Sequence, residues 1–230
     1  ANRNLESFSY SVSHDLRAPL RSIEGFSALL LQEYGNAIPP GGKTLVEKTR
    51  QSTVKMAELI DAILEFSRTS RRDLRREEVD MKALAEDVLN EQLATQHGRQ
   101  VKVEMGGLPP CWADRVLIRQ VVQNLLSNAL KFSRRRETPH ISLGSFFEGT
   151  RCVYYVRDNG VGFDMAYRNH LFKVFERLHD SKDFEGTGIG LAIVENIITR
   201  HGGSVWLESD IDKGCTCYFT FGESEGKGIS

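Results

Sequence analysis

Two long stripes of apolar residues, spaced three and four positions apart, constrain the fold of this chain most. The first stripe runs from Leu5 to Leu30 and the second from Leu45 to Phe66, and the segment between them contains the Gly and Pro residues typical of a turn. The spacing predicts two amphipathic helices that form an antiparallel hairpin. Because two helices with one apolar face each bury that face poorly by themselves, we expect a homodimer through a four-helix bundle.

The rest of the sequence mixes helix and strand patterns. Helical periodicity covers residues 81–96, 114–132 and 190–201, whereas strand-like stretches lie at 101–105, 141–147, 151–158, 204–209 and 215–221. This mixture predicts an α+β domain with helices on one face of a mixed sheet. The expected division is a hairpin over 1–70, a polar linker over 71–80, an α+β domain over 81–222 and a disordered tail over 223–230.

The charge balance excludes some classes of function. The 230 residues contain 30 Lys and Arg against 31 Asp and Glu, so no overall field attracts nucleic acid or anionic lipid. No apolar run approaches the roughly 20 residues that cross a bilayer, and the first residues lack the pattern of a signal peptide. We therefore expect a cytoplasmic protein with no membrane segment in this chain and no nucleic-acid partner.

One histidine is expected on the polar side of the first helix. His14 lies two positions from both Val12 and Leu16, so at about 100° per residue it faces away from the apolar stripe. Asp15 can accept a hydrogen bond from one ring nitrogen and leave the other nitrogen able to attack an electrophile. A helical histidine is more often a surface residue without a role, so both interpretations stay open at this point.

The helix predicted over 114–132 has one polar face. Asn124, Asn128 and Lys131 share that face, and apolar residues occupy the opposite one. Carboxamide oxygens can bind Mg²⁺ while a lysine neutralises phosphate, which suits a magnesium nucleotide. The alternative is an amphipathic helix whose polar face meets water.

Two glycine-containing segments follow. Asp158 ends a predicted strand, and Gly160 and Gly162 come where backbone turns tightly or approaches a ligand, although an Asn-Gly hairpin turn is the alternative. The second segment precedes the last helix, whose N-terminal amides could receive phosphate oxygens. Its glycines are Gly186, Gly188 and Gly190. The pattern is neither GxxxxGK[ST] nor GxGxxG, which excludes the P-loop and the dinucleotide-binding fold.

Taken in order, five motifs resemble those of two-component sensor histidine kinases. The H, N, G1, F and G2 boxes of that family are similar to SHDLRAPL, QNLLSNALKF, VRDNGVGF, LFKVFERL and GTGIGLAIV. The resemblance covers residues 5 to 222, and the string FERLHDSKDFEGTGIGLA is further similar to kinases of phytochrome-type photoreceptors. It implies a dimerisation and histidine-phosphotransfer hairpin followed by an α/β-sandwich ATP-binding domain of the Bergerat type.

The resemblance also implies roles for single residues. His14 matches the phosphoacceptor, Asp15 its acidic neighbour, Asn124 and Asn128 the N-box asparagines near Mg²⁺, with Asn128 as the metal ligand. Asp158 matches the adenine-recognising carboxylate, and Arg177 the position that reaches the terminal phosphate. The other residues of the implied nucleotide site, including a mobile lid at the G2 box, are Lys131, Phe132, Gly160, Gly162, Phe172, Phe175, Gly186, Thr187, Gly188, Gly190 and Leu191.

The function implied is an autokinase that uses ATP and Mg²⁺ to phosphorylate His14 and then phosphorylates an aspartate in the receiver domain of a response regulator. Two alternatives are an ATPase of the gyrase and heat-shock-chaperone type, and a dimeric scaffold without kinase activity. We also expect a fragment of a longer sensor, with the sensory domain outside this chain. Ala18 departs from the Thr or Asn common in relatives that dephosphorylate their regulator, which predicts weak phosphatase activity.

Overall fold

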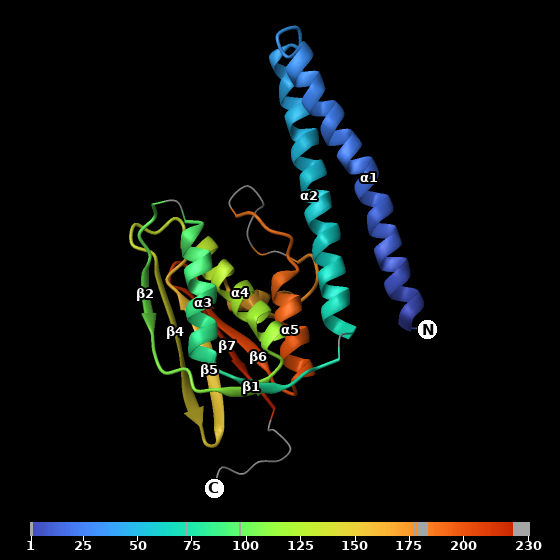
Figure 1. Ribbon diagram of the computed structural model, residues 1–230. Coiled ribbons are helices and arrows are strands. Elements are labelled where there is room, and N and C mark those ends of the chain that lie inside the picture. The colour runs from blue at the N-terminus through green and yellow to red at the C-terminus, as the bar shows by residue number, and fades with distance from the viewer. Residues whose placement is uncertain (1, 72, 97, 177, 179–183, 223–230) are drawn as a thin grey trace. The chain divides into compact units, whose positions relative to one another are not determined.

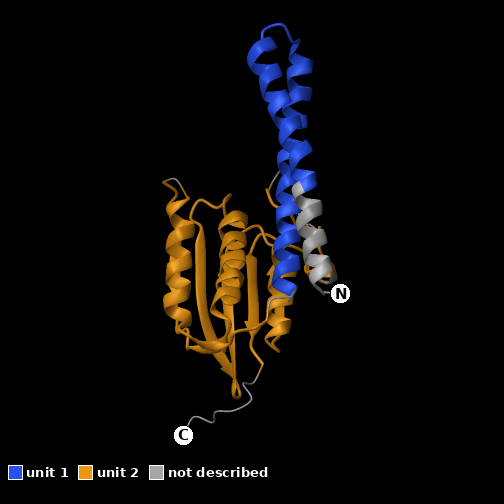
Figure 2. Cartoon of the chain, turned by 45° about the vertical axis from the view of Figure 1, so that its right-hand side comes forward, with its two compact units in different colours: residues 1–71 blue, residues 72–230 orange. Residues whose placement is uncertain are grey.

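The structure is a computed structural model that describes residues 2–71, 73–96, 98–176, 178 and 184–222, with the backbone alone for residues 2–14, Arg71 and Asn169. The chain forms two compact units, residues 1–71 and residues 72–230 (Figure 2). The tail expected over 223–230 lies outside the described residues. No described helix is long and apolar enough to cross a membrane.

The first unit is the predicted antiparallel helical hairpin. Helices α1 (Asn2–Tyr34) and α2 (Pro40–Arg71) pack against each other, and a short turn joins them (Figure 1). The turn starts where the amide groups of Ala37 and Ile38 donate to the carbonyl oxygen of Tyr34. Helix α1 continues through Pro19.

Much of the predicted apolar stripe remains exposed on the single hairpin. Leu20 and Leu64 are buried, but Phe26 exposes 71% of its surface. Other exposed members of the two stripes are Leu16, Ile23, Leu30, Leu45, Met56 and Ile63. Apolar surface of this extent is unfavourable in water, so the hairpin has the surface expected of an element that needs a covering partner.

The second unit contains a five-stranded sheet and a short two-stranded one. The large sheet has the order β2 (Lys102–Met105), β4 (His140–Glu148), β5 (Arg151–Asp158), β7 (Gly214–Thr220), β6 (Val205–Asp210). Strands β2 and β4 are parallel and the other pairs are antiparallel. The predicted mixed sheet is therefore confirmed.

Three helices lie side by side on one face of the large sheet, as Figure 1 shows. They are α3 (Met81–Ala94), α4 (Arg115–Phe132) and α5 (Gly190–Arg200). Helix α4 lies between the other two and buries an apolar face that includes Ile118, Val121 and Leu125. The side chain of Asp114 accepts from the amide groups of Val116 and Leu117 and so fixes the first turn of α4. A 3₁₀ helix, η1 (Met165–His170), follows β5.

The expected linker over 71–80 contains one short strand near its C-terminal end. Residues Glu77–Val79 form strand β1, which pairs antiparallel with β3 (Cys111–Ala113) in the short sheet. The sequence has no strand pattern here, because the surrounding residues are charged and Val79 is the one buried residue of β1. The segment is therefore anchored to the second unit.

Candidate nucleotide site

The polar face of α4 meets the glycine segment before α5. The Asn124 carboxamide donates through Nδ2 to the carbonyl oxygen of Gln120, at 2.9 Å. Its Oδ1 would lie 2.7 Å from a Cβ atom added to Gly190, so a side chain at Gly190 would collide with Asn124. The backbone of the G2 segment therefore lies directly against the N-box helix.

Lys131 and Phe132 extend this contact at the C-terminal end of α4. The Nζ atom of Lys131 lies 4.3 Å from the ring centroid of Phe132 and would lie 3.3 Å from a Cβ at Gly186. The Phe132 ring packs on Phe184, with centroids 5.1 Å apart, and Phe184 is buried. Phe184 thus anchors one end of the segment that leads to the G2 glycines, while residues 179–183 lie outside the described residues.

Asp158 is a buried carboxylate at the end of β5. Only 8% of its surface is exposed, and its Oδ1 accepts a hydrogen bond from the Gly160 amide at 2.7 Å. Burial raises the pKa of Asp158 to about 6, and this effect outweighs hydrogen bonds from the Gly160 and Cys215 backbone and the charge of Arg136, which lower it. A carboxylate kept in such surroundings suits a ligand that donates hydrogen bonds to it.

Close backbone contacts leave no room for a side chain at Gly160 and Gly162, which follow Asp158. A Cβ at Gly160 would lie 2.6 Å from the carbonyl oxygen of Phe132, the same residue that packs on Phe184. Gly162 has a φ of +59°, and its Cβ would collide with the carbonyl oxygen of Asp210. The G1 segment is therefore held against α4 on one side and against the turn after β6 on the other.

The F box reaches the G2 segment through its backbone. The amide of Phe175 donates to the carbonyl oxygen of Gly188 at 3.2 Å, and Phe175 has a φ of +70°, which is uncommon for a residue with a side chain. Phe172 is half-buried and lines a cavity of about 660 Å³ beside β6, together with Trp206. The Phe175 ring itself is exposed, so the structure places its backbone at the site and its side chain at the surface.

The remaining predicted residues divide between the two units. Asn128, Thr187 and Leu191 are half-buried on α4 and around the start of α5. His14 lies within α1, and Asp15, the next residue, is exposed. Both the expected hydrogen bond to the His14 ring and the position of Arg177 fall outside what the structure describes.

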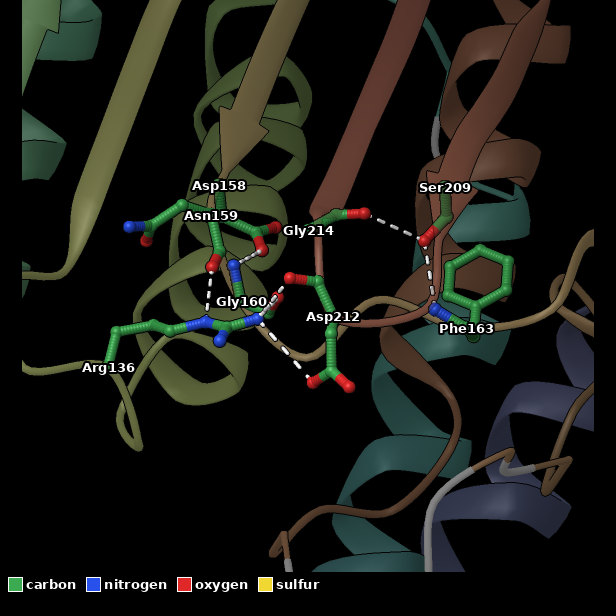
Figure 3. Close-up of polar contacts among 8 residues, drawn as sticks. All are labelled: Arg136, Asp158, Asn159, Gly160, Phe163, Ser209, Asp212 and Gly214. Carbon is green, nitrogen blue, oxygen red and sulfur yellow. Dashed lines mark hydrogen bonds and ion pairs between the residues drawn. The ribbon is translucent and has the colours of Figure 1, made fainter.

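Three residues at this site were not predicted from the sequence. Arg136 donates to backbone carbonyl oxygens of Asn159 and Gly160, and Gly214 approaches Asp158 so closely that a Cβ there would collide with its carbonyl oxygen. The Ser209 hydroxyl accepts a hydrogen bond from the amide of Phe163 (Figure 3). A run of three arginines that begins two positions after the N box is the one sequence signal that could have indicated Arg136.

Two protein-family models match the chain in consecutive segments. Residues 4–72 match the His Kinase A (phospho-acceptor) domain, and residues 113–225 match the histidine kinase-, DNA gyrase B-, and HSP90-like ATPase. His14 lies in the first segment, and the contacts among α4, Asp158 and the G2 glycines lie in the second. The second match supports ATP as the nucleotide of this site.

Several known proteins are similar to this chain over nearly its whole length. The chain is 35% identical over 225 residues to cyanobacterial phytochrome B of Nostoc sp. and 34% identical over 220 residues to the methanogenesis regulatory histidine kinase FilI of Methanothrix harundinacea. These matches cover 96% and 95% of this chain, but 30% and 25% of those proteins, so the chain spans less than a third of their length. The phytochrome match confirms the expected similarity to phytochrome-type kinases.

One solved structure has a similar fold. Full-length ShkA in complex with AMPPNP aligns with a TM-score of 0.66 at 25% identity, over 94% of this chain and 45% of that protein. The predicted fold, a helical hairpin followed by an α/β ATP-binding domain, is confirmed by this likeness and by the two family matches. The chain belongs to the sensor histidine kinases, as a phospho-acceptor hairpin followed by their ATP-binding domain.

Proposed function

We propose that this chain transfers the terminal phosphoryl group of ATP to His14 and then to an aspartate of a response regulator. In the first step a ring nitrogen of His14 attacks the γ-phosphorus, a nitrogen–phosphorus bond forms, and the bond to the bridging oxygen breaks as ADP leaves. In the second step the aspartate carboxylate attacks the same phosphorus and the histidine leaves. The match of residues 4–72 to a phospho-acceptor domain supports His14 as the acceptor, with Asp15 orienting its ring.

One observation carries the nucleotide half of the proposal. The N-box helix contacts both glycine segments, through Asn124 at Gly190 and through the Phe132 carbonyl oxygen at Gly160. Adenine is then recognised at Asp158, whose carboxylate accepts from the amino group, and the phosphates lie toward Lys131 and the start of α5. In the described structure no side chain caps α5 and no acidic residue lies in its first turn, which leaves its amide groups suited to phosphate oxygens.

The other motif residues complete this proposed site. Phe132 and the F-box residues Phe172 and Phe175 border the nucleotide, and Arg177 reaches the terminal phosphate. The segment of Thr187, Gly188 and Leu191 closes over the phosphates as part of a mobile lid, which the backbone bond between Phe175 and Gly188 connects to the F box.

The carboxamides of α4 fit a magnesium ion bound with ATP. The hydrogen bond from Asn124 Nδ2 to Gln120 fixes the carboxamide so that its oxygen is on the side of the G2 segment. Oxygen ligands of this kind suit Mg²⁺, and Asn128 lies one helical turn further along, where we propose it as the metal ligand. When bound, Mg²⁺ would neutralise charge on the β- and γ-phosphates.

The proposal includes the partners and the domain limits. The exposed apolar stripe of the hairpin is covered by a second copy in a four-helix bundle, and the hairpin presents His14 to a receiver domain. Residues 1–70 form the dimerisation and phosphotransfer domain, and residues 81–222 form the catalytic domain. Because ATP and receiver domains are available in the cytoplasm, we propose that the chain acts there, downstream of a sensory domain in a longer protein.

Incubation of the chain with γ-labelled ATP and Mg²⁺ tests the proposal. Acid-labile label on His14, absent from His14→Gln, is the expected result. Release of phosphate without labelled protein would instead support an ATPase, and the absence of both would support a scaffold. Either of these outcomes overturns the proposed kinase activity.

A further inference from the structure

Arg136 joins two turns at the end of the large sheet. Its Nε donates to the carbonyl oxygen of Asn159 at 2.7 Å, and its Nη2 donates to the carbonyl oxygens of Gly160 at 2.8 Å and Asp212 at 2.6 Å. The same Nη2 lies 3.7 Å from the carboxylate of Asp212 (Figure 3). One guanidinium therefore bridges the turn over 158–163, which we call the G1 turn, and the turn over 210–214 between β6 and β7.

The two turns are in direct backbone contact at this point. The amide of Asp212 donates to the carbonyl oxygen of Val161 at 2.7 Å. Gly162 and Gly214 have φ values of +59° and +97°, and a Cβ on either would collide with a carbonyl oxygen of the opposite turn. The Ser209 hydroxyl donates to the carbonyl oxygen of Gly214 and accepts from the amide of Phe163, both at 2.9 Å. A small displacement of one turn must therefore move the other.

We infer that Arg136 is a positioning residue that holds the G1 turn in the conformation in which Asp158 receives adenine. The inference rests on the proposed function, because it assigns Arg136 to the same nucleotide site. The geometry favours arginine specifically, since its planar group offers several donors in a fixed fork and stays charged at every physiological pH. A lysine at this position has a single nitrogen and cannot reproduce the fork.

The charge of Arg136 has a second effect, on the ionisation of Asp158. Arg136 lowers the pKa of Asp158 against the larger opposing effect of burial. The cavity that Asp158 lines also contains Arg157, Glu208, Asp210, Lys213 and Cys215. Of these, Lys213 pairs with Asp210 at 3.1 Å, Arg157 donates to Thr216, and Glu208 accepts from Tyr218. Removing the charge at Arg136 therefore raises the pKa of Asp158 further, and the neutral carboxyl persists to higher pH.

The test compares Arg136→Gln, Arg136→Lys and the control Arg151→Gln in the full chain. Arg151 is an exposed residue at the start of β5, so its replacement removes the same charge away from the site. ATP affinity is measured by calorimetry with Mg²⁺ at about pH 6.5 and about pH 8.5, which lie above the raised pKa of Asp158 in the parent. Circular dichroism and thermal unfolding show whether each variant is folded.

We expect Arg136→Gln to bind ATP roughly tenfold more weakly at the higher pH, which corresponds to about 1.4 kcal/mol, and more weakly still at the lower pH. Arg136→Lys should lose affinity to a similar extent but keep the parent ratio between the two pH values, because it keeps the charge. The ratio distinguishes the loss of charge in Arg136→Gln from a general loss of stability, which would lower the two affinities alike. Thermal unfolding distinguishes the loss of positioning in Arg136→Lys from a general loss of stability. Arg151→Gln should match the parent.

The outcomes separate this inference from the proposed function. If the parent chain binds ATP and labels His14 but Arg136→Gln binds within twofold of it at both pH values, the inference alone is overturned. If Arg136→Gln does not fold, Arg136→Lys decides, and parent-like affinity in that variant overturns the inference. A parent chain that binds no ATP contradicts the proposed function itself.

Discussion

Asp158→Asn should stabilise the nucleotide-free second unit while it removes ATP binding. Burial raises the pKa of Asp158 from 3.8 to about 6, so the folded state ionises this carboxyl less readily than the unfolded chain does. Because the folded pKa is the higher one, the ionised group costs stability, and the cost appears as the pH rises from about 4 to about 6. This difference in pKa between the folded and unfolded states lowers the free energy of unfolding by about 3 kcal/mol at neutral pH.

The substitution keeps the shape and removes the charge. The amide oxygen of Asn can still accept the hydrogen bond from the Gly160 amide, which the carboxylate accepts at 2.7 Å. Asn has one acceptor oxygen in place of two, so a weaker hydrogen bond from the Cys215 backbone offsets part of the gain. The free energy of unfolding of the variant, relative to the parent, should therefore increase by up to about 3 kcal/mol between about pH 4 and about pH 8. The midpoint of thermal unfolding should rise by several degrees at the higher pH.

Urea unfolding of both proteins across this pH range, without nucleotide, measures the effect. Both tryptophans, Trp112 and Trp206, lie in the second unit, so their fluorescence reports on that unit alone. Asp87→Asn, at an exposed position on α3, is the matched control and should show no such pH-dependent gain. ATP affinity of Asp158→Asn, measured by calorimetry at about pH 8, should fall because an amide can present a donor to the adenine amino group. A variant with no added stability at about pH 8 and parent-like ATP affinity refutes the reasoning.

The other predictions concern the hairpin. His14→Gln should abolish labelling by γ-labelled ATP and leave ATP affinity unchanged in calorimetry, because the proposed nucleotide contacts all lie in the second unit; retained labelling would exclude His14 as the acceptor. Phe26→Glu should convert the dimer to a monomer in sedimentation, because it places a charge on an apolar stripe where Phe26 exposes 71% of its surface; an unchanged dimer would contradict this use of the stripe. Ala18→Thr should accelerate dephosphorylation of the phosphorylated cognate regulator by about 10²-fold in the presence of ADP, because a hydroxyl can orient the attacking water and a methyl group cannot. Fast release by the parent with no gain in the variant would show that Ala18 is not limiting.

Local periodicity predicted the elements of this chain well, except for one short strand inside the expected linker. The helices over 81–94, 115–132 and 190–200 and the five strands of the large sheet lie where the apolar spacing placed them. Strand β1 was not predicted, because its three residues lie in a charged region and have no strand pattern of their own. Its stability comes from pairing with β3, more than 30 residues away in the sequence. Pairing between distant segments is not encoded in the period of either segment.

Some residues of the candidate site could be predicted from the sequence and others could not. That Asn124, Asn128 and Lys131 share a face of α4 follows from the helical repeat alone, since that repeat is a property of neighbouring residues. The role of Arg136 does not, because its acceptors are backbone carbonyl oxygens 23, 24 and 76 positions further along the chain. Any residue type supplies a carbonyl oxygen, so no sequence pattern marks such acceptors.

Short-range spacing and residue type were enough to predict a helical hairpin and a mixed α/β domain, whereas the acceptor histidine and the nucleotide site were implied by the resemblance of five motifs to a known family. The burial of Asp158, which raises its pKa to about 6, could not be predicted from local patterns. The same holds for the junction of the G1 turn with the β6–β7 turn. Burial and close backbone approach arise from segments brought together by the sheet order, and the free energy of a charge depends on that assembled environment rather than on its neighbours in the chain.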